Sequence, residues 1–167
     1  MLKQDLINIR KTEESDIKFI VSCLENKSDV FVNQCGYGKR FFTSPITQKQ
    51  ILNFQNSRNQ DSEFFTILNN DIIIGSFELR KYDAEKKGTV ARFLIYDRYR
   101  FKGYGTTALK ILKDYAFDNL GLIKINLGVF DFNESALKCY KKAGFTEYER
   151  THFEEDNLIR IDMELKK

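Results

Sequence analysis

One short polar turn combines glycines with basic side chains: Arg100-Phe101-Lys102-Gly103-Tyr104-Gly105-Thr106. A strand-forming run, Val90 to Ile95, precedes it, and an amphipathic helical pattern follows it. The first backbone N–H groups of a helix lack intrahelical acceptors, and the helix dipole favours an anion there. The two glycines leave no Cβ between an anion and these amides, and the arginine and lysine add positive charge. The segment predicts a phosphate-binding turn.

Two other interpretations of these glycines compete with this one. Gly103 to Ala108 fits the G-x-G-x-x-A pattern of dinucleotide-binding folds. That pattern follows its strand directly and has an acidic residue about 20 positions later. Here Tyr96 to Lys102 separate the strand from the glycine, and Leu122 to Lys124 contain no carboxylate, so this interpretation fails. An ordinary turn explains the glycines but not the basic residues beside them.

A second group of residues follows further along the chain: Asn133, Ser135, Ala136, Tyr140, Gly144 and Phe145. With Arg100, Gly103 and Gly105, these residues resemble two motifs of the GNAT N-acetyltransferases, Q/R-x-x-G-x-G/A and N-x-S/A-A-x-x-x-Y-x-x-x-G-F. The two motifs stand in the family's order, with one strand between them. The start of the chain, Ile7 to Arg10 with Asp16, and its end, Asp162 to Leu165, resemble the branch that includes ribosomal-protein acetyltransferases.

The resemblance implies a site for acetyl-CoA as cosubstrate and no metal site. In this interpretation the strand backbone at Phe93 and Ile95 pairs with the pantetheine arm, and the amides from Phe101 to Thr106 hold the diphosphate. Asn133 is then expected to hydrogen-bond the pantetheine, and Tyr140 to lie near the sulfur. Spacing alone leaves two other roles open, a helix cap for Asn133 and a core aromatic for Tyr140.

Direct acetyl transfer from a thioester to an amine requires a proton acceptor for the amine and an acid for the departing thiolate. Tyr140 is the expected acid, and the adjacent Cys139 is expected to point elsewhere and to be inert. In the branch that the chain resembles, many proteins carry a base glutamate at the place that falls on Val90 here. Glu78 is the preferred substitute and Glu134 the next, although each also fits an ordinary surface carboxylate. A base that acts through water is a further alternative.

The expected function is acetyl transfer to a primary amine, namely a small amine, an amino acid or a peptide N-terminus. A non-catalytic acyl-CoA-binding module is the main alternative, because Val90 replaces the expected glutamate. A protein-interaction domain that kept the fold is a third. The aromatic segment Phe31 to Phe42 either covers the acceptor or anchors a loop to the core. Its Lys39 and Arg40 argue against a polycationic acceptor.

The elements that position these residues are predicted from hydrophobic periodicity, caps and turns. Expected strands are 7–10, 64–68, 72–79, 90–95, 123–129, 145–152 and 158–165. Expected helices begin after Thr12, taken as a cap, and at the Thr47/Gln50 capping box, and then cover about 104–119 and 134–143. The order β-α-α-β-β-β-α-β-α-β-β predicts an α/β (α+β) fold. By resemblance this is one GNAT-like domain over residues 1–167, with a mixed, mostly antiparallel sheet.

Composition bounds the remaining classes of function. A net charge of +3 is too small to imply nucleic acid, and one histidine with three cysteines gives little material for a metal site or a catalytic triad. No apolar run suits a membrane span, and the first ten residues lack the apolar region of a signal peptide. We therefore expect a cytoplasmic protein without membrane partners, as a monomer or homodimer.

Overall fold

The computed structural model describes residues 6–58, 60–154 and 157–167. Residues 1–5, which hold half of the stretch used in the signal-peptide expectation, lie outside the described residues. Within these ranges, no helix combines the length and the apolar character that a membrane crossing requires.

One seven-stranded sheet runs through the described part of the chain in the order β1-β2-β3-β4-β5-β7-β6. Its strands are β1 (Ile7–Lys11), β2 (Ser62–Asn69), β3 (Ile72–Tyr82), β4 (Lys87–Ile95), β5 (Lys124–Phe130), β6 (Thr146–Phe153) and β7 (Leu158–Lys166). All neighbours pair antiparallel except β4 and β5, which are parallel. The predicted class, a mixed and mostly antiparallel sheet, is confirmed.

The helices are α1 (Ile17–Leu24), α2 (Asp29–Gln34), α3 (Gln48–Asn56), α4 (Tyr104–Asp114) and α5 (Glu134–Ala143). A π-helical turn, Tyr115–Asn119, continues α4. The sequence predicts two helices before β2, whereas the structure also has α2. This short helix begins at Asp29, before the aromatic segment Phe31 to Phe42, and overlaps the start of that segment. The Ser28 hydroxyl caps it by accepting a hydrogen bond of 3.2 Å from the Phe31 amide. The predicted capping box of Thr47 and Gln50 is present at the start of α3.

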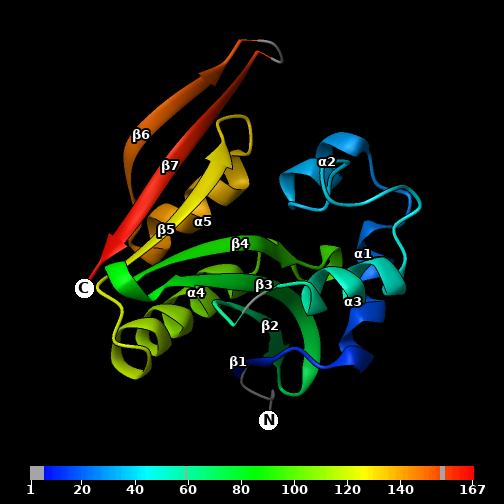
Figure 1. Cartoon of the computed structure of the whole chain (residues 1–167), viewed down its shortest axis with the longest axis horizontal. Coiled ribbons are helices and arrows are strands. Elements are labelled where there is room, and N and C mark those ends of the chain that lie inside the picture. The colour runs from blue at the N-terminus through cyan, green and yellow to red at the C-terminus, as the bar shows by residue number, and fades with distance from the viewer. Residues whose placement is uncertain (1–5, 59, 155–156) are drawn as a thin grey trace.

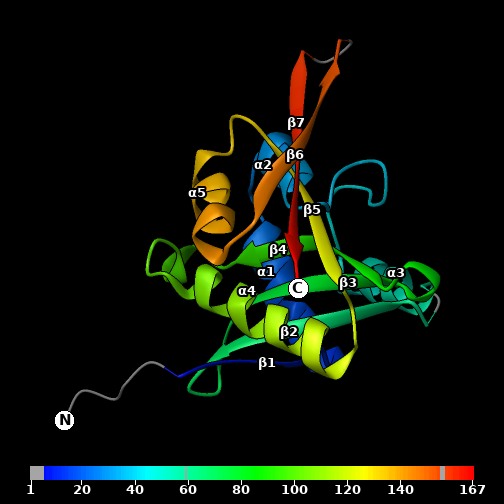
Figure 2. The same cartoon turned by 90° about the vertical axis from the view of Figure 1, so that its left-hand side faces the viewer.

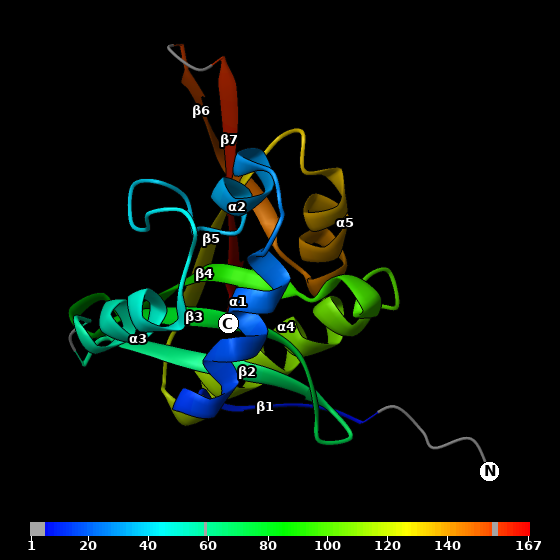
Figure 3. The ribbon, with the colours of Figure 1, turned by 90° about the vertical axis from the view of Figure 1, so that its right-hand side faces the viewer.

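Two hydrophobic cores cover the two faces of β1–β4. On one face α4 and α5 pack against the sheet, with Leu109 and Phe77 in their shared core (Figure 2). On the other face α1 and α3 lie against the same strands, and Ile20, Ile51 and Leu94 share the second core (Figure 3). The functional segments therefore stand on a sheet that is held from both sides.

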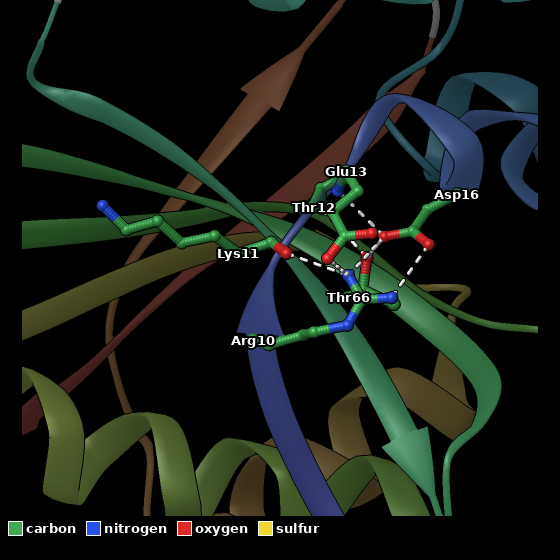
Figure 4. A network of polar contacts seen from close by, with 6 residues as sticks. All are labelled: Arg10, Lys11, Thr12, Glu13, Asp16 and Thr66. Carbon is green, nitrogen blue, oxygen red and sulfur yellow. Dashed lines mark hydrogen bonds and ion pairs between the residues drawn. The ribbon is translucent and has the colours of Figure 1, made fainter.

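The junction between β1 and α1 is fixed by one buried carboxylate (Figure 4). Asp16 accepts hydrogen bonds from both terminal nitrogens of Arg10 (2.6 and 3.0 Å), from the Glu13 amide (2.9 Å) and from the Thr66 hydroxyl (2.8 Å). Thr12 is not the cap that the sequence predicts, because Glu13 occupies the cap position and the Thr12 hydroxyl instead lies 3.1 Å from that of Thr66. Burial raises the pKa of Asp16, but these donors outweigh it and the pKa is lowered.

The central strands β4 and β5 separate soon after they meet. They pair only at residues 87–89 of β4 and 124–126 of β5, and β5 then rises away from β4 (Figure 1). A bulge in β4 accompanies this separation, because Ser76 pairs with Leu94 whereas Glu78 pairs with Ala91. Arg92 lies in the bulge with φ +52°. A β-bulge redirects side chains, and here it places Arg92 and the following residue against different cores.

Candidate active site

A cleft of about 850 Å³ opens where β4 and β5 diverge. Its walls are the exposed edge of β4, the turn from Arg100 to Thr106, the end of β5, one face of α5 and the end of α2. This volume lies within the range of about 300–1,000 Å³ that is usual for small-molecule sites. The two sequence motifs therefore meet across one cleft.

The turn before α4 has the geometry of an anion site. Gly103 adopts the left-handed conformation (φ +81°), and a Cβ built on it would meet nothing within 4 Å. The first helical hydrogen bond of α4 is donated by the Thr107 amide to the Gly103 carbonyl (3.1 Å). The amides of Gly105 and Thr106 precede that bond, so helix geometry gives them no intrahelical acceptor.

Gly105 has a different role from the one that the sequence predicts. A Cβ built there would meet Cys139 Sγ at 3.1 Å, Ile95 Cγ1 at 3.4 Å and Phe93 Cε1 at 3.5 Å. It would therefore press against β4 and α5 rather than occupy space left for an anion. The glycine lets the first turn of α4 approach both elements closely.

The basic residues of the turn are also placed differently from the expectation. The Arg100 Nε donates a hydrogen bond to the Ile95 carbonyl (2.9 Å), and its guanidinium lies 3.7 Å from Asp97 and 4.8 Å from the centroid of the Phe31 ring. Arg100 therefore links the turn to β4 through Ile95 and to α2 through Phe31. Lys102 is not among the residues that line the cleft.

The edge of β4 offers backbone groups to the cleft. After Thr89, β4 pairs with no strand on its β5 side among the described residues, and Phe93 and Ile95 both line the cleft. The Ile95 carbonyl is already the acceptor for Arg100.

Phe101 lines the cleft as well, with φ +62° and 90% of its surface exposed. Tyr104 and Thr106 complete the lining on this side.

Asn133 performs the capping role that spacing alone allowed. Its side-chain oxygen accepts hydrogen bonds from the Ala136 amide (3.3 Å) and the Ser135 hydroxyl (3.2 Å), at the start of α5. It also lines the cleft. The pairing with pantetheine stays a prediction.

Tyr140 on α5 lines the cleft while most of the side chain is buried. Its ring centroid lies 6.2 Å from that of Phe93 and 6.3 Å from that of Phe145. Burial raises the pKa of Tyr140 above its usual value, so the phenol stays protonated at neutral pH.

Cys139 does not point away as expected: it lines the cleft, and its sulfur lies 3.5 Å from the Thr106 hydroxyl. Burial raises the pKa of this thiol too.

Glu78, the preferred candidate base, lies inside a cage of donors. It is fully buried and accepts hydrogen bonds from Ser62 (2.6 Å), from Arg80 Nε and Nη2 (3.0 Å each) and from Arg92. Arg58 Nε lies 3.5 Å away. Burial raises the pKa of Glu78, but the hydrogen bonds and the nearby charges prevail and lower it. Glu78 does not line the cleft, so the structure does not bring it together with Tyr140.

The arginines around Glu78 are the functional candidates that the sequence interpretation missed. Arg80 and Arg92 both line the cleft, and Arg92 is almost completely buried. The Arg92 guanidinium carbon lies 4.2 Å from the centroid of the Phe54 ring and 5.0 Å from that of Phe41. The bulge in β4 and the pairing of β3 with β4 bring these side chains together. No local pattern indicated the cluster, because β4 contains one arginine and its partner Glu78 stands on the neighbouring strand.

The aromatic segment before α3 anchors the loop to the protein. Tyr37 and Phe42 are buried in the second core, with ring centroids 5.4 Å apart, whereas Phe41 is partly exposed. None of the three lines the cleft, although residues of α2 and Gly36 do. Of the two expectations for this segment, the geometry favours anchoring for Tyr37 and Phe42.

Comparisons with known proteins agree with this geometry. Residues 33–145 match the acetyltransferase (GNAT) family model. The chain is 38% identical over 63 residues to YycN, an uncharacterised N-acetyltransferase of Bacillus subtilis, and that match spans 38% of this chain and 40% of YycN. It is 25% identical over 143 residues to spermidine N(1)-acetyltransferase of Escherichia coli, covering 84% of this chain and 73% of the relative.

The fold is shared with solved acetyltransferase structures. The spermidine N-acetyltransferase of Vibrio cholerae, solved in complex with CoA and spermine, superposes with a TM-score of 0.80 over 96% of this chain and 95% of that chain, at 20% identity. Since the family model covers most of the chain and both motifs lie on one cleft, the chain belongs to the GNAT family of acetyltransferases.

Proposed function

We propose that this chain transfers the acetyl group of acetyl-CoA directly to a primary amine. The observation that carries the proposal is the cleft itself, in which the open turn at Gly103, the exposed edge of β4 and Tyr140 face one space. Each of these three parts supplies one requirement of the reaction: an anion site, a guide for an extended arm, and an acid.

Acetyl-CoA fits the residues present. The amides of Gly105 and Thr106 and the open space at Gly103 suit a diphosphate, because a helix N-terminus favours an anion. The edge of β4 at Phe93 supplies backbone groups that an extended pantetheine amide can pair with. Asn133 stands on the opposite wall. In this proposal Arg100 positions the turn rather than contacting phosphate.

Tyr140 is the proposed acid. A thiol such as cysteine has a reference pKa of about 8.5, and a tyrosine of about 10, so a protonated phenol can assist a departing thiolate. The raised pKa of Tyr140 makes the phenol a weaker proton donor but keeps it in the protonated form, which donates a hydrogen bond to the thiolate as it forms. Among the described residues, its hydroxyl makes no hydrogen bond, which leaves it available to the substrate.

The proton acceptor is the second requirement. Glu134 is the one carboxylate among the described residues that line the cleft, and it is mostly exposed and paired with Lys138 at 3.5 Å. An amine that is already a free base needs less help. A peptide α-amine has a reference pKa of about 7.7–8.0 against about 10.4 for a lysine-type amine. We therefore propose a terminal α-amine as acceptor, with water as the final proton acceptor.

The test is acetyl-CoA-dependent thiol release across a panel of amines, with calorimetry of acetyl-CoA alone. Turnover of a peptide or amino-acid α-amine supports the proposal. Acetyl-CoA binding without turnover of any amine favours the non-catalytic module, and no binding at all favours an interaction domain. Polyamines belong in the panel, because spermidine is the acceptor named for two of the similar proteins. The ribosomal-protein-acetyltransferase-like branch, the cytoplasmic location and the monomer or homodimer stay predictions.

A further inference from the structure

The end of the cleft that Arg80 and Arg92 line holds a cluster with more positive than negative charges. Arg58, Arg80 and Arg92 all pair with the single carboxylate of Glu78. The cluster therefore has a surplus of two positive charges. The cluster lies at the far end of the cleft from Gly103. Arg80 on β3 stands opposite Thr89 on β4, at the point where β4 is still paired with β5.

The donors of this cluster also exceed its acceptors. Each guanidinium has five N–H groups, whereas one carboxylate has about four lone-pair positions. Glu78 already accepts from Ser62, twice from Arg80 and once from Arg92. The Nε atoms of Arg58 and Arg92 are fully buried without a hydrogen-bond acceptor among the described residues. Burying donors without acceptors costs free energy. The cluster therefore has both a surplus of positive charge and N–H donors that lack an acceptor.

The cluster is held in place rather than free to rearrange. The ring of Phe54 lies 4.2 Å from the Arg92 guanidinium and 4.4 Å from that of Arg58. A Cβ built on Gly36 would come within 3.0 Å of Arg92 Cγ, so the end of α2 closes tightly over this side chain. Arg80 retains 30% exposure of its side chain and lines the cleft, and is therefore the arginine that an incoming group meets.

We propose that Arg80, supported by Arg92, binds a carboxylate carried by the acceptor, so that the substrate is an α-amine with an anionic group in the same residue. This inference rests on the proposed function. Arginine suits the task because its planar fork matches a carboxylate. The same surplus charge excludes polycations, because like charges repel at short range. Arg80, Arg92 and Tyr140 all line the same cleft, so the anion site and the acid face one space.

The carboxylate can come from two sources, the terminal carboxyl of an amino acid or the side chain of an acidic first residue of a peptide. Matched pairs separate them: alanine against alaninamide for the first, and tripeptides beginning with aspartate against asparagine for the second. In one pair or both, we expect the carboxylate member to be used about 10- to 100-fold more efficiently, as is typical for hydrogen bonds to a charged group. The comparison uses kcat/KM for the free-base amine, because a neighbouring carboxylate makes the α-amine of alanine more basic than that of alaninamide. Spermidine and cadaverine serve as polycationic comparisons.

Three variants connect the preference to the cluster. Arg80→Gln is expected to raise the KM of the favoured carboxylate acceptor about 10- to 100-fold with a small change in kcat, and to remove the difference within the matched pair. Arg80→Lys is expected to restore part of it. Lys81→Gln is the matched control, because Lys81 is the next residue of β3 and pairs with Glu63, outside the cluster. Acetyl-CoA affinity should be unchanged in all three.

Several results overturn the inference. Equal or better use of the amide member in both matched pairs, or better use of spermidine than of either carboxylate acceptor, does so while leaving the acetyltransferase proposal intact. A loss of acetyl-CoA affinity in Arg80→Gln does so too, because it assigns the cluster to the cofactor. If no amine is acetylated, calorimetry of N-acetylalanine and N-acetylaspartate with the CoA-bound protein tests the anion site independently of catalysis. Binding that Arg80→Gln abolishes supports the anion site although the proposed function fails, and no binding overturns the anion site as well.

Discussion

The two ends of the cleft are made from different parts of the polypeptide. Around Gly103 the site consists of backbone amides whose directions are set by one left-handed residue and a helix start. Around Glu78 it consists of charged side chains from three places in the chain, held by aromatic rings. The first end therefore depends on backbone conformation and close packing, whereas the second depends on charge. Substitutions can for this reason separate cofactor binding from acceptor selection.

The largest expected effect lies between the two ends. Tyr140→Phe should lower kcat about 100-fold while the KM for acetyl-CoA changes little, because general acids contribute at least this much and act only in the transition state. Tyr148→Phe, on the exposed strand β6, is the control and should leave kcat unchanged. Steady-state kinetics in a regime limited by chemistry is the measurement. An unchanged kcat for Tyr140→Phe would remove the acid from the mechanism.

At the backbone end, Gly105→Val should weaken acetyl-CoA binding about 10- to 100-fold, as expected for overpacking of a tight contact. The cause is contact with Cys139 and Ile95, not occupation of the anion space. Gly105→Ala should have a smaller effect, and adding Cys139→Ala should reverse it by removing the sulfur 3.1 Å away. Calorimetry in folded variants measures the affinities. If Cys139→Ala gives no recovery, the packing explanation is incorrect.

At the charged end, Glu78→Gln distinguishes an organising carboxylate from a base. We expect the turnover rate at saturating acceptor to stay within about 3-fold, because a carboxylate with a lowered pKa and several donors is a weak proton acceptor. The melting temperature should fall clearly, because removing one partner of a buried ion pair costs about 3–5 kcal/mol. A turnover rate that instead drops about 100-fold, with loss of the acidic limb of the pH–rate profile, would identify Glu78 as the base.

The smallest effect on activity is expected outside both ends. Asp16→Asn should leave kcat and acetyl-CoA affinity unchanged but lower the stability by about 1–3 kcal/mol, because it weakens the charged hydrogen bonds with Arg10. Since the pKa of folded Asp16 is lowered, its stabilisation is complete above the unfolded value of about 3.9 and is lost as the pH falls through the folded value. The difference between the melting temperatures of the two proteins should therefore stay constant from pH 7 to about 5 and shrink as the pH falls below about 3.9. Melts that remain parallel would contradict this role.

These contrasts also explain how much the sequence could predict. The turn at Gly103 is contiguous, so its glycines, helix start and preceding strand were all visible in one segment. The strands and the starts of α3 and α5 were visible for the same reason, through alternation and caps such as Thr47 and Asn133. The short helix α2 was missed because glycines and aromatics just after it obscured its period.

The arginine cluster could not be predicted from the sequence, because its members are far apart in the chain. Arg58, Arg80 and Arg92 are separated by 22 and 12 positions in the numbering. Strand register brings Arg92 to the carboxylate of Glu78, whereas Arg58 reaches it from the connection between α3 and β2. The bulge at Arg92 shifts that register by one residue, and nothing in the local sequence specifies it. The direction of Gly105 could not be predicted either, since it depends on where α5 places Cys139.

The most direct test follows the acetyl group itself. The protein is mixed with acetyl-CoA and equal amounts of alanine, alaninamide, a tripeptide that begins with aspartate, and spermidine. Mass spectrometry then locates the acetyl group on each small molecule and on the protein. We expect an acetyl group on the α-amine of alanine, of the aspartate peptide or of both, and none on Cys139 or elsewhere on the protein. An acetylated Cys139 that passes its acetyl group to the amine would contradict direct transfer, and an absence of acetylated amine despite acetyl-CoA binding would contradict the proposed function.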